Sequence, residues 1–283
     1  TLAPLAQIAN LFGRANNAKT SYKRLASFME ETQEDDVSEK NKGAIRREKL
    51  GSIEFKDTTY RYPEADLDTL RSINLSVSEG EKVAILGRNG SGKSTLMKLA
   101  SGLFKASDGL VMYDGVDIKQ LHTDDLSRSI GIVLQDVQLF SGSIRENITM
   151  GRQDINQDDL ISAGKLSGLD DFVSKIPGGY DLQLSDGGKG LSGGQRQSIA
   201  LARAIVHKPT HFILDEPTSA MDMNAENIFI SQMGSIMQDS TMLIVTHRMP
   251  LLNLVDRIIV MNEGQIVEDG PKEEIINKLN QPR

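Results

Sequence analysis

Two kinds of hydrophobic pattern organise the chain downstream of residue 50. In the first kind, apolar and polar residues alternate, as at Ile53 and Phe55, over 73–77 and over 110–113. Such alternation is typical of antiparallel strands that bury one face. The second kind consists of short apolar runs, mostly separated by stretches of helical spacing, at 83–86, 130–134, 212–214, 242–245 and 257–261. Buried parallel strands have this pattern, so the sequence predicts an α/β domain with a parallel core and an antiparallel sheet.

Two further segments extend and interrupt this domain, which we expect to span 50–283. Between 136 and 192, short helical stretches lie among glycine-rich turns, which predicts an inserted helical subdomain over about 136–206. Residues 1–31 repeat apolar side chains at three- and four-residue spacing, as an amphipathic helix does, and an acidic, polar tract of linker type comes next. This helix either packs on the domain's own surface or, as the linker favours, meets a partner. Because the chain begins at Thr1 rather than Met, we expect it to be a piece of a longer protein.

A glycine-rich turn joins the apolar run 83–86 to a stretch of helical spacing. The turn reads Gly87-Arg88-Asn89-Gly90-Ser91-Gly92-Lys93-Ser94, followed by Thr95, and has the spacing G-x-x-x-x-G-K-[ST] of a phosphate-binding loop. Glycines let the backbone N–H groups turn inward at the positive end of the next helix, where anions bind. Lys93 can reach the β- and γ-phosphates, and the Ser94 hydroxyl can ligate Mg²⁺. We therefore expect residues 87–95 to hold a nucleotide.

Other predicted parallel strands end in residues that suit phosphate chemistry. Gln135, the Asp215-Glu216 pair and His247 each stand at or just beyond the end of one of the apolar runs. In open α/β sheets, ligands bind beyond the carboxyl ends of the strands. If these strands are parallel neighbours, their end residues gather around the bound phosphates.

Each of these residues has a role that phosphoryl transfer requires. Asp215 could hold Mg²⁺ through water, and Glu216 could polarise the attacking water as general base. Gln135 could contact Mg²⁺ or water, and His247 could orient the γ-phosphate. The plainer alternatives are an acidic turn before Pro217 and structurally satisfied Gln and His residues. We expect catalytic roles for Glu216, His247 and Lys93, and metal contacts for Ser94, Gln135 and Asp215.

A second phosphate-seeking element lies about a hundred residues after the first, at Leu191-Ser192-Gly193-Gly194-Gln195, where a helical stretch begins. With this motif the chain resembles the nucleotide-binding domain of an ATP-binding cassette (ABC) transporter, whose signature is LSGGQ. The resemblance covers roughly residues 50–275. It extends to the order of the motifs, which runs from Tyr62 through the phosphate loop, Gln135, the signature and the Asp215-Glu216 pair to His247.

The resemblance implies ATP and Mg²⁺ in a P-loop NTPase (RecA-like) core with an antiparallel β subdomain and a helical insert. It implies that Tyr62 stacks on adenine, although Tyr60 competes for this role and either ring could cover the core instead. Ser219-Ala220-Met221-Asp222 would form the D-loop, with Asp222 near the nucleotide. In that family two domains pair head to tail. The ATP contacts of Ser192, Gly193, Gly194 and Gln195 would therefore complete a second copy's site, with Ser192 and Gly194 serving the partner's nucleotide.

The subfamily is narrowed by two stretches. Residues 140–148 resemble exporters, and 1–31 resemble the segment after the last membrane helix of bacterial type I secretion permease/ATPases. This implies that 1–49 end a transmembrane domain of the same polypeptide, at the cytoplasmic face of the bacterial inner membrane. A periplasmic adaptor and an outer-membrane channel would serve the full protein. Met221 and Asp186 replace the commoner Leu and Glu, and both changes keep chemical character.

Composition removes several function classes. The net charge of the 283 residues is −7, and no basic stripe suggests a nucleic-acid partner. The absence of cysteine excludes disulfides and thiolate metal sites. No apolar run approaches the 18 residues of a membrane span.

Several alternatives share the nucleotide site. The nearest is an exporter of lipid, drug or peptide. A soluble ABC ATPase acting on DNA or ribosomes should carry a long coiled-coil insertion or a second cassette, and an importer subunit should lack the amphipathic leader. A non-hydrolysing binding module is disfavoured by the intact Glu216 and His247. A small GTPase is disfavoured because no N-K-x-D motif occurs.

Overall fold

The computed structural model describes residues 19, 21–22, 41 and 43–279. The chain divides into two units, Thr1–Ala44 and Ile45–Arg283. The leader helix and linker predicted for 1–49 lie almost wholly outside the described residues. The second unit begins at Ile45, which forms an isolated parallel bridge with Leu121.

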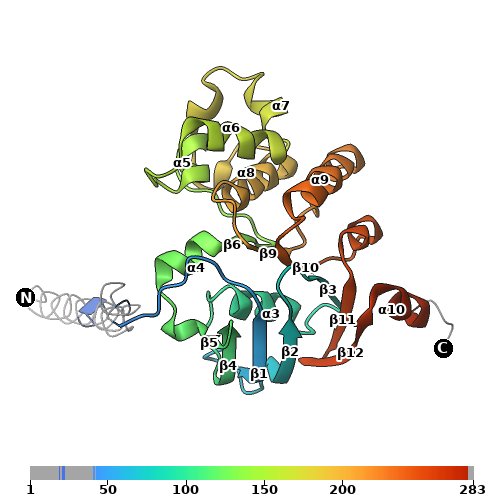
Figure 1. The fold of residues 1–283 in the computed structure, drawn as a ribbon. Helices are drawn as coiled ribbons and strands as arrows, with labels where there is room; N and C mark the ends of the chain where they lie inside the picture. The colour runs from blue at the N-terminus through green and yellow to red at the C-terminus, as the bar shows by residue number, and fades with distance from the viewer. Residues whose placement is uncertain (1–18, 20, 23–40, 42, 280–283) are drawn as a thin grey trace, which may run out of the picture. The chain divides into compact units, whose positions relative to one another are not determined.

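A mostly parallel sheet forms the centre of the second unit (Figure 1). Within the described residues its order is β12-β11-β3-β10-β9-β6, and only β12 runs antiparallel to its neighbour. The strands are β3 (Lys82–Gly87), β6 (Ile130–Val133), β9 (His211–Asp215), β10 (Thr241–Val245), β11 (Arg257–Asn262) and β12 (Gln265–Pro271). The predicted parallel strands are confirmed, with β6 ending at Val133 rather than Leu134.

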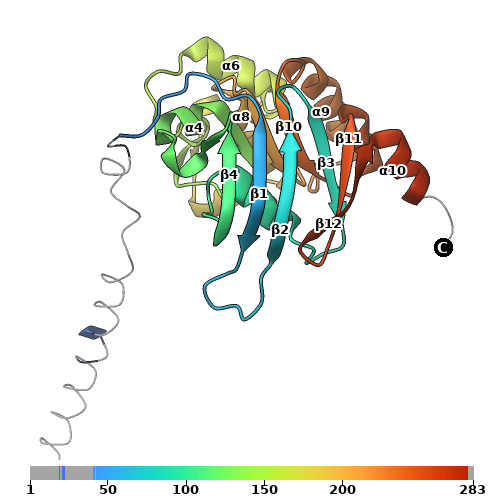
Figure 2. The ribbon, with the colours of Figure 1, turned by 60° about the horizontal axis from the view of Figure 1, so that its bottom comes forward.

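An antiparallel sheet covers one face of this core, in the order β2-β1-β4-β5. Its strands are β1 (Ile53–Tyr60), β2 (Leu70–Val77), β4 (Asp108–Tyr113) and β5 (Val116–Asp117), and Figure 2 shows the first three side by side. Phe55 lies opposite Leu75 in the ladder, as the alternating pattern predicts. Helix α3 (Lys93–Ala100) packs with this sheet and with β3, β9 and β10 in a single apolar cluster.

Helices dominate the segment between β6 and β9, at the top of Figure 1. They are α5 (Ile144–Thr149), α6 (Gln157–Leu166), α7 (Asp170–Val173) and α8 (Gly193–Ile205), with the short hairpin strands β7 (Gly142–Ser143) and β8 (Gln183–Leu184) and the 3₁₀ turns η2 (Gly179–Asp181) and η3 (Asp186–Gly188). Helix α8 belongs to two cores. Its Ile199 and Ala202 pack among the other helices, whereas Leu201 packs with β9 and β10. The signature helix therefore joins the helical region to the central sheet.

The remaining elements close the fold. Helix α9 (Met223–Ile236) and the turn η4 (Met249–Leu254) pack on the face of the central sheet opposite α3, together with α10 (Lys272–Leu279). The connection from β5 to β6 is made by η1 (Ile118–Gln120) and α4 (Thr123–Ser129). Both faces of the parallel strands are thereby covered, which is the usual requirement of a parallel sheet.

A buried histidine ties the start of this unit to the central sheet. The Nε2 of His211, the first residue of β9, lies 2.6 Å from the Gly51 carbonyl oxygen, and its ring packs edge-to-face on Tyr113. A carbonyl only accepts, so Nε2 carries the proton and Nδ1 accepts from the Thr210 hydroxyl at 3.0 Å. Burial lowers the pKa of His211 below its ordinary value of 6.5.

This histidine predicts a loss of stability in mild acid. As the pH falls below about 6.5, the unfolded chain binds a proton at His211 that the folded chain refuses, so the free energy of unfolding falls. The variant His211→Gln should show a smaller decline in urea unfolding measured across this range. His207, whose pKa burial also lowers, remains in the variant and sets the residual slope. An unchanged pH dependence in the variant would assign the effect elsewhere.

Candidate nucleotide-binding site

The phosphate loop needs glycine where it meets its neighbours. Gly87 has φ 152°, and a Cβ there would lie 2.3 Å from the carbonyl oxygen of Met261. Gly92, with φ 99°, would place a Cβ 2.6 Å from the Leu70 side chain. Neither position can carry a side chain without moving β11 or β2. The loop is therefore held close between these strands, directly before α3.

Lys93 opens α3 and lies over the loop. Its ammonium donates to the carbonyl oxygens of Gly87 and Arg88, both at 2.9 Å. Desolvation lowers the pKa of Lys93, while Asp215 and Glu216 oppose this shift. The positive charge of Lys93 is thus stabilised beside the loop by two backbone carbonyls and by the nearby carboxylates.

A cavity of about 360 Å³ opens beside Lys93. The predicted residues that line it come from the phosphate loop and from the ends of β6 and β9: Asn89, Gly90, Gly92, Lys93, Ser94, Thr95, Gln135, Asp215 and Glu216. Strands β3, β10, β9 and β6 are parallel neighbours, which is the condition on which this gathering was predicted. Thr69, before β2, also lines the cavity, and no pattern in the sequence pointed to it.

Asp215 is a buried carboxylate with one unsatisfied oxygen. Desolvation raises the pKa of Asp215, although the Ser94 hydroxyl donates to its carboxylate and opposes the shift. Within the described part of the chain, Oδ1 of Asp215 has no hydrogen-bond partner. A buried acceptor normally has one, and a water molecule of a hydrated cation would supply the missing donor.

Mg²⁺ fits the donors at this place. Among the described residues, no group of three or more His, Asp or Glu side chains could hold a metal ion by itself. Mg²⁺ does not need such a group, because in phosphate sites it keeps waters and takes one or two carboxylates plus phosphate oxygens. Ser94, Gln135 and Asp215, all at the cavity, offer suitable oxygen atoms.

Glu216 follows Asp215 in an uncommon backbone conformation. Its φ is 48°, in the left-handed region, which costs a residue other than glycine about 1–2 kcal/mol. Its amide donates to the Val245 carbonyl at 2.9 Å, and its Oε1 lies 3.3 Å from Nε2 of His247. The turn thus brings the carboxylate to the half-exposed imidazole at the end of β10.

His247 lies at the border of the cavity rather than in its lining. It contacts two neighbouring hollows, one shared with Glu216 and another of about 670 Å³ shared with Gly87, Arg88 and β11. Ser91 is buried at 3% exposure, so its side chain faces the protein. Of the predicted loop residues, Gly87, Arg88 and Ser91 do not line the cavity at Lys93.

The two candidate tyrosines differ in accessibility. Tyr60 is 8% exposed and stacks on Phe104, with ring centroids 5.1 Å apart. Tyr62 is 36% exposed, and its hydroxyl lies 3.2 Å from Oγ1 of Thr95 beside the cavity. Tyr60 is a core residue, whereas Tyr62 is accessible to solvent.

The signature residues stand at the start of α8. Ser192 caps α8: its hydroxyl accepts from the Gln195 amide at 3.2 Å, and its own amide donates to Oε1 of Gln195 at 2.8 Å. Gly193 faces Ala220, and a Cβ on Gly193 would lie 2.8 Å from the Cβ of Ala220. None of these residues, nor Gly194, lines the cavity at Lys93. Asp222 caps α9 by accepting from the Ala225 amide at 2.8 Å.

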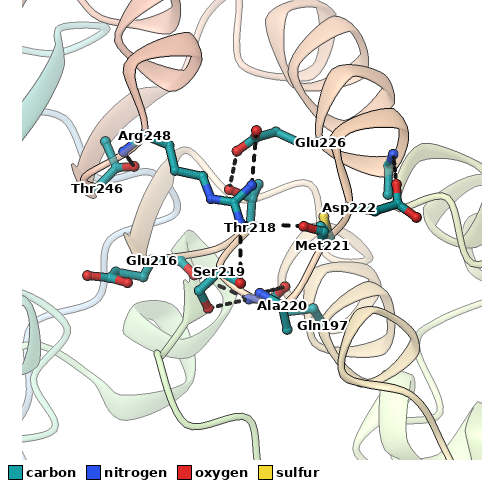
Figure 3. A network of polar contacts seen from close by, with 11 residues as sticks. Gln197, Glu216, Thr218, Ser219, Ala220, Met221, Asp222, Glu226, Thr246 and Arg248 are labelled. Carbon is teal, nitrogen blue, oxygen red and sulfur yellow. Dashed lines mark hydrogen bonds and ion pairs between the residues drawn. The ribbon is translucent and has the colours of Figure 1, made fainter.

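The sequence did not predict a role at the site for Gln197, Thr218, Glu226 or Arg248. Thr218 belongs to the loop that leads from Glu216 to Asp222, and the other three side chains surround this loop (Figure 3). Arg248 directly follows His247, which is the one sequence signal that could have drawn attention to it. The contact of Arg248 with Glu226 has no signature in the sequence, because the two residues belong to different elements.

Comparison with known proteins agrees with this geometry. The sequence profile of the ABC transporter family matches residues 70–219. The leukotoxin export ATP-binding protein LtxB of Aggregatibacter actinomycetemcomitans is 38% identical over 275 residues, which are 97% of this chain and 38% of that protein. The cyclolysin secretion/processing ATP-binding protein CyaB of Bordetella pertussis is 37% identical over 96% of this chain and 38% of its own length. The leukotoxin translocation ATP-binding protein LktB of Mannheimia haemolytica is 38% identical over 99% of this chain and 39% of its own length.

A solved structure has the same fold. A bacterial Atm1-family ABC exporter with ATP bound superposes with a TM-score of 0.75 at 31% identity, covering 82% of this chain and 40% of the exporter chain. The present chain thus spans about two fifths of the length of these relatives. In the part that the structure describes, no helix has the length and apolar content to cross a bilayer. The chain belongs to the ABC transporter family.

Proposed function

We propose that this domain hydrolyses ATP to power protein export by a type I secretion system. The observation that carries hydrolysis is the Glu216–His247 contact of 3.3 Å at the rim of the Lys93 cavity. Identity to three toxin-export proteins extends over 96–99% of the chain and supports the export role. An exporter of another cargo is the second candidate, because the Atm1-family exporter shares 31% identity.

The roles of the residues follow from their places. Residues 87–95 bind the phosphates of ATP through backbone N–H groups and the Lys93 ammonium. Glu216 accepts the proton of the attacking water, and His247 orients the γ-phosphate. Gln135 contacts this water or the cation, and Tyr62 stacks on adenine. Mg²⁺, held by Ser94, Gln135 and, through water, Asp215, would neutralise charge on the phosphates.

The proposed active unit is a head-to-tail homodimer. In one chain, the signature residues 192–195 do not line the cavity that holds Lys93. Their helix start suits an anion, so they would complete the site of a second copy, and Asp222 would lie near the shared nucleotide. The further partners are a transmembrane domain of the same polypeptide, a periplasmic adaptor and an outer-membrane channel. With these partners the domain would work at the cytoplasmic face of the bacterial inner membrane. No nucleic-acid partner is proposed.

Sedimentation tests the dimer directly. A variant Glu216→Gln retains the phosphate loop and should shift from monomer to dimer on addition of Mg-ATP, while the wild type hydrolyses ATP. A variant Lys93→Ala should stay monomeric under the same conditions, because the main phosphate contact is lost. Turnover by a wild type that never dimerises would contradict the composite site.

A further inference from the structure

The loop from Glu216 to Asp222 is held from two sides by side chains of other elements (Figure 3). On one side lies Arg248, which follows β10 and His247. On the other side lies Gln197, in the first turns of α8. Together these two side chains make direct polar contacts to each residue of 219–221 and to Glu216 itself.

Arg248 contacts the loop from the first side. Its Nη2 donates to the carbonyl oxygens of Ser219 at 3.3 Å and Met221 at 3.4 Å. Its Nη1 lies 3.0 Å from Oε2 of Glu226 on α9. The Glu226 side chain is only 7% exposed, and its other oxygen accepts from the Thr218 hydroxyl at 2.7 Å. Both oxygens of this buried carboxylate have partners, so Glu226 fixes the Arg248 guanidinium that contacts the loop.

Gln197 contacts the loop from the other side. Its Nε2 donates to the Glu216 carbonyl at 3.2 Å and to the Ser219 hydroxyl at 3.1 Å, and its Oε1 accepts from the Ala220 amide at 3.1 Å. Gln197 is buried at 2% exposure, so water does not compete for these bonds. Its whole amide group is therefore committed to the loop.

We infer that Arg248, with its carboxylate Glu226, and Gln197 are positioning residues that clamp the loop 216–222 and so hold Glu216 at its 3.3 Å contact with His247. Glu216 sits at a left-handed φ, and such a conformation persists only where surrounding contacts fix it. The clamp supplies those contacts on both sides of the turn. This inference rests on the proposed role of Glu216, but the clamp itself is a property of the chain without nucleotide.

Arg248→Lys tests whether Arg248 positions the loop or only stabilises the fold. Lysine can still pair with Glu226, but its compact ammonium cannot replace a planar fork that reaches the carboxylate and two carbonyls at once. In the nucleotide-free chain, we expect the amides of 219–221 to exchange hydrogen about tenfold faster or more, as the loss of a charged hydrogen bond implies. Amides of β9 and β10 should keep their protection. Arg248→Ala strands the buried Glu226 and is avoided for that reason.

Gln197→Met tests the hydrogen bonds between Gln197 and the loop. Methionine matches the length of glutamine and fills the buried space but makes none of the bonds to the loop. The same amides should exchange faster, and for both variants kcat should fall by about ten- to a hundredfold while ATP affinity is retained, since misplacing a catalytic group acts on turnover.

Arg145→Lys is the matched control. The Arg145 side chain is 36% exposed, against 37% for Arg248, and it pairs with the exposed Asp181 at 2.9 Å, away from the loop. This control should leave exchange at 219–221 unchanged. Wild-type exchange rates in both Arg248→Lys and Gln197→Met would overturn the clamp, and so would a fall in ATP affinity that accounts for the lost activity. A wild type without ATP hydrolysis would overturn the proposed function instead, and the exchange result would stand.

Discussion

The variant Glu216→Gln is expected to hydrolyse ATP about 10²–10⁴-fold more slowly than the wild type, the usual loss when a general base is removed. Glutamine preserves the shape of the side chain and can still accept a hydrogen bond from His247, but it cannot take the proton of the attacking water. ATP binding at the phosphate loop should persist. Steady-state turnover and nucleotide binding, measured on the same preparations, check this expectation.

Glu263→Gln provides the control for this variant. Glu263 lies in the turn between β11 and β12 with φ 46°, nearly the φ of Glu216, and it is exposed to solvent. The two substitutions therefore remove the same charge at nearly the same φ. Glu263→Gln should leave turnover unchanged. Turnover close to the wild type in Glu216→Gln would move the base to another group.

Gly194→Glu should reduce hydrolysis by about a hundredfold or more, because a like charge facing the partner's phosphates costs several kcal/mol. Gly194 suits this experiment better than Gly193. A Cβ on Gly194 would lie 3.6 Å from the Ala220 carbonyl oxygen, an ordinary contact, whereas one on Gly193 would collide with Ala220. The variant should therefore fold, and its own Lys93 cavity should bind ATP as before.

Two measurements on Gly194→Glu show which chain's nucleotide the signature serves. Binding of ATP to the isolated variant reports on its own cavity, and turnover reports on the composite site. Gly234→Glu, in α9 with open space around the glycine, controls for placing a glutamate in a helix. An equal loss of binding and turnover in Gly194→Glu would show that the signature serves the chain's own nucleotide.

The sequence predicted best those features that depend on local patterns. Alternation at Ile53 and Phe55 identified β1, and the continuous apolar runs identified the parallel strands, because burial on one face or on both leaves different periodicities. The phosphate loop was recognisable because its glycine spacing reflects backbone conformations that other residues avoid. The gathering of Gln135, Asp215 and Glu216 followed from the rule on strand ends, given parallel neighbours.

The features that the sequence did not predict depend on distant contacts. The order of the strands, with β3 between β11 and β10, has no local signal. Thr69 reaches the cavity only because the sheets pack as they do. The pairing of Arg248 with Glu226 joins a loop to a helix, and neither residue interrupts a pattern. The difference in burial between Tyr60 and Tyr62 has no local signal either, since both fit the alternation of β1 and its continuation.

The absence of the signature residues from the lining of the Lys93 cavity has a genetic consequence. If each composite site draws its phosphate loop from one chain and its signature from the other, a defect in either motif inactivates every site of a homodimer. A mixed dimer of one chain altered at Lys93 and another altered at Gly194 is different, because both lesions fall in one site and leave the other without any. Two alleles that each abolish activity would then complement one another within a single assembly.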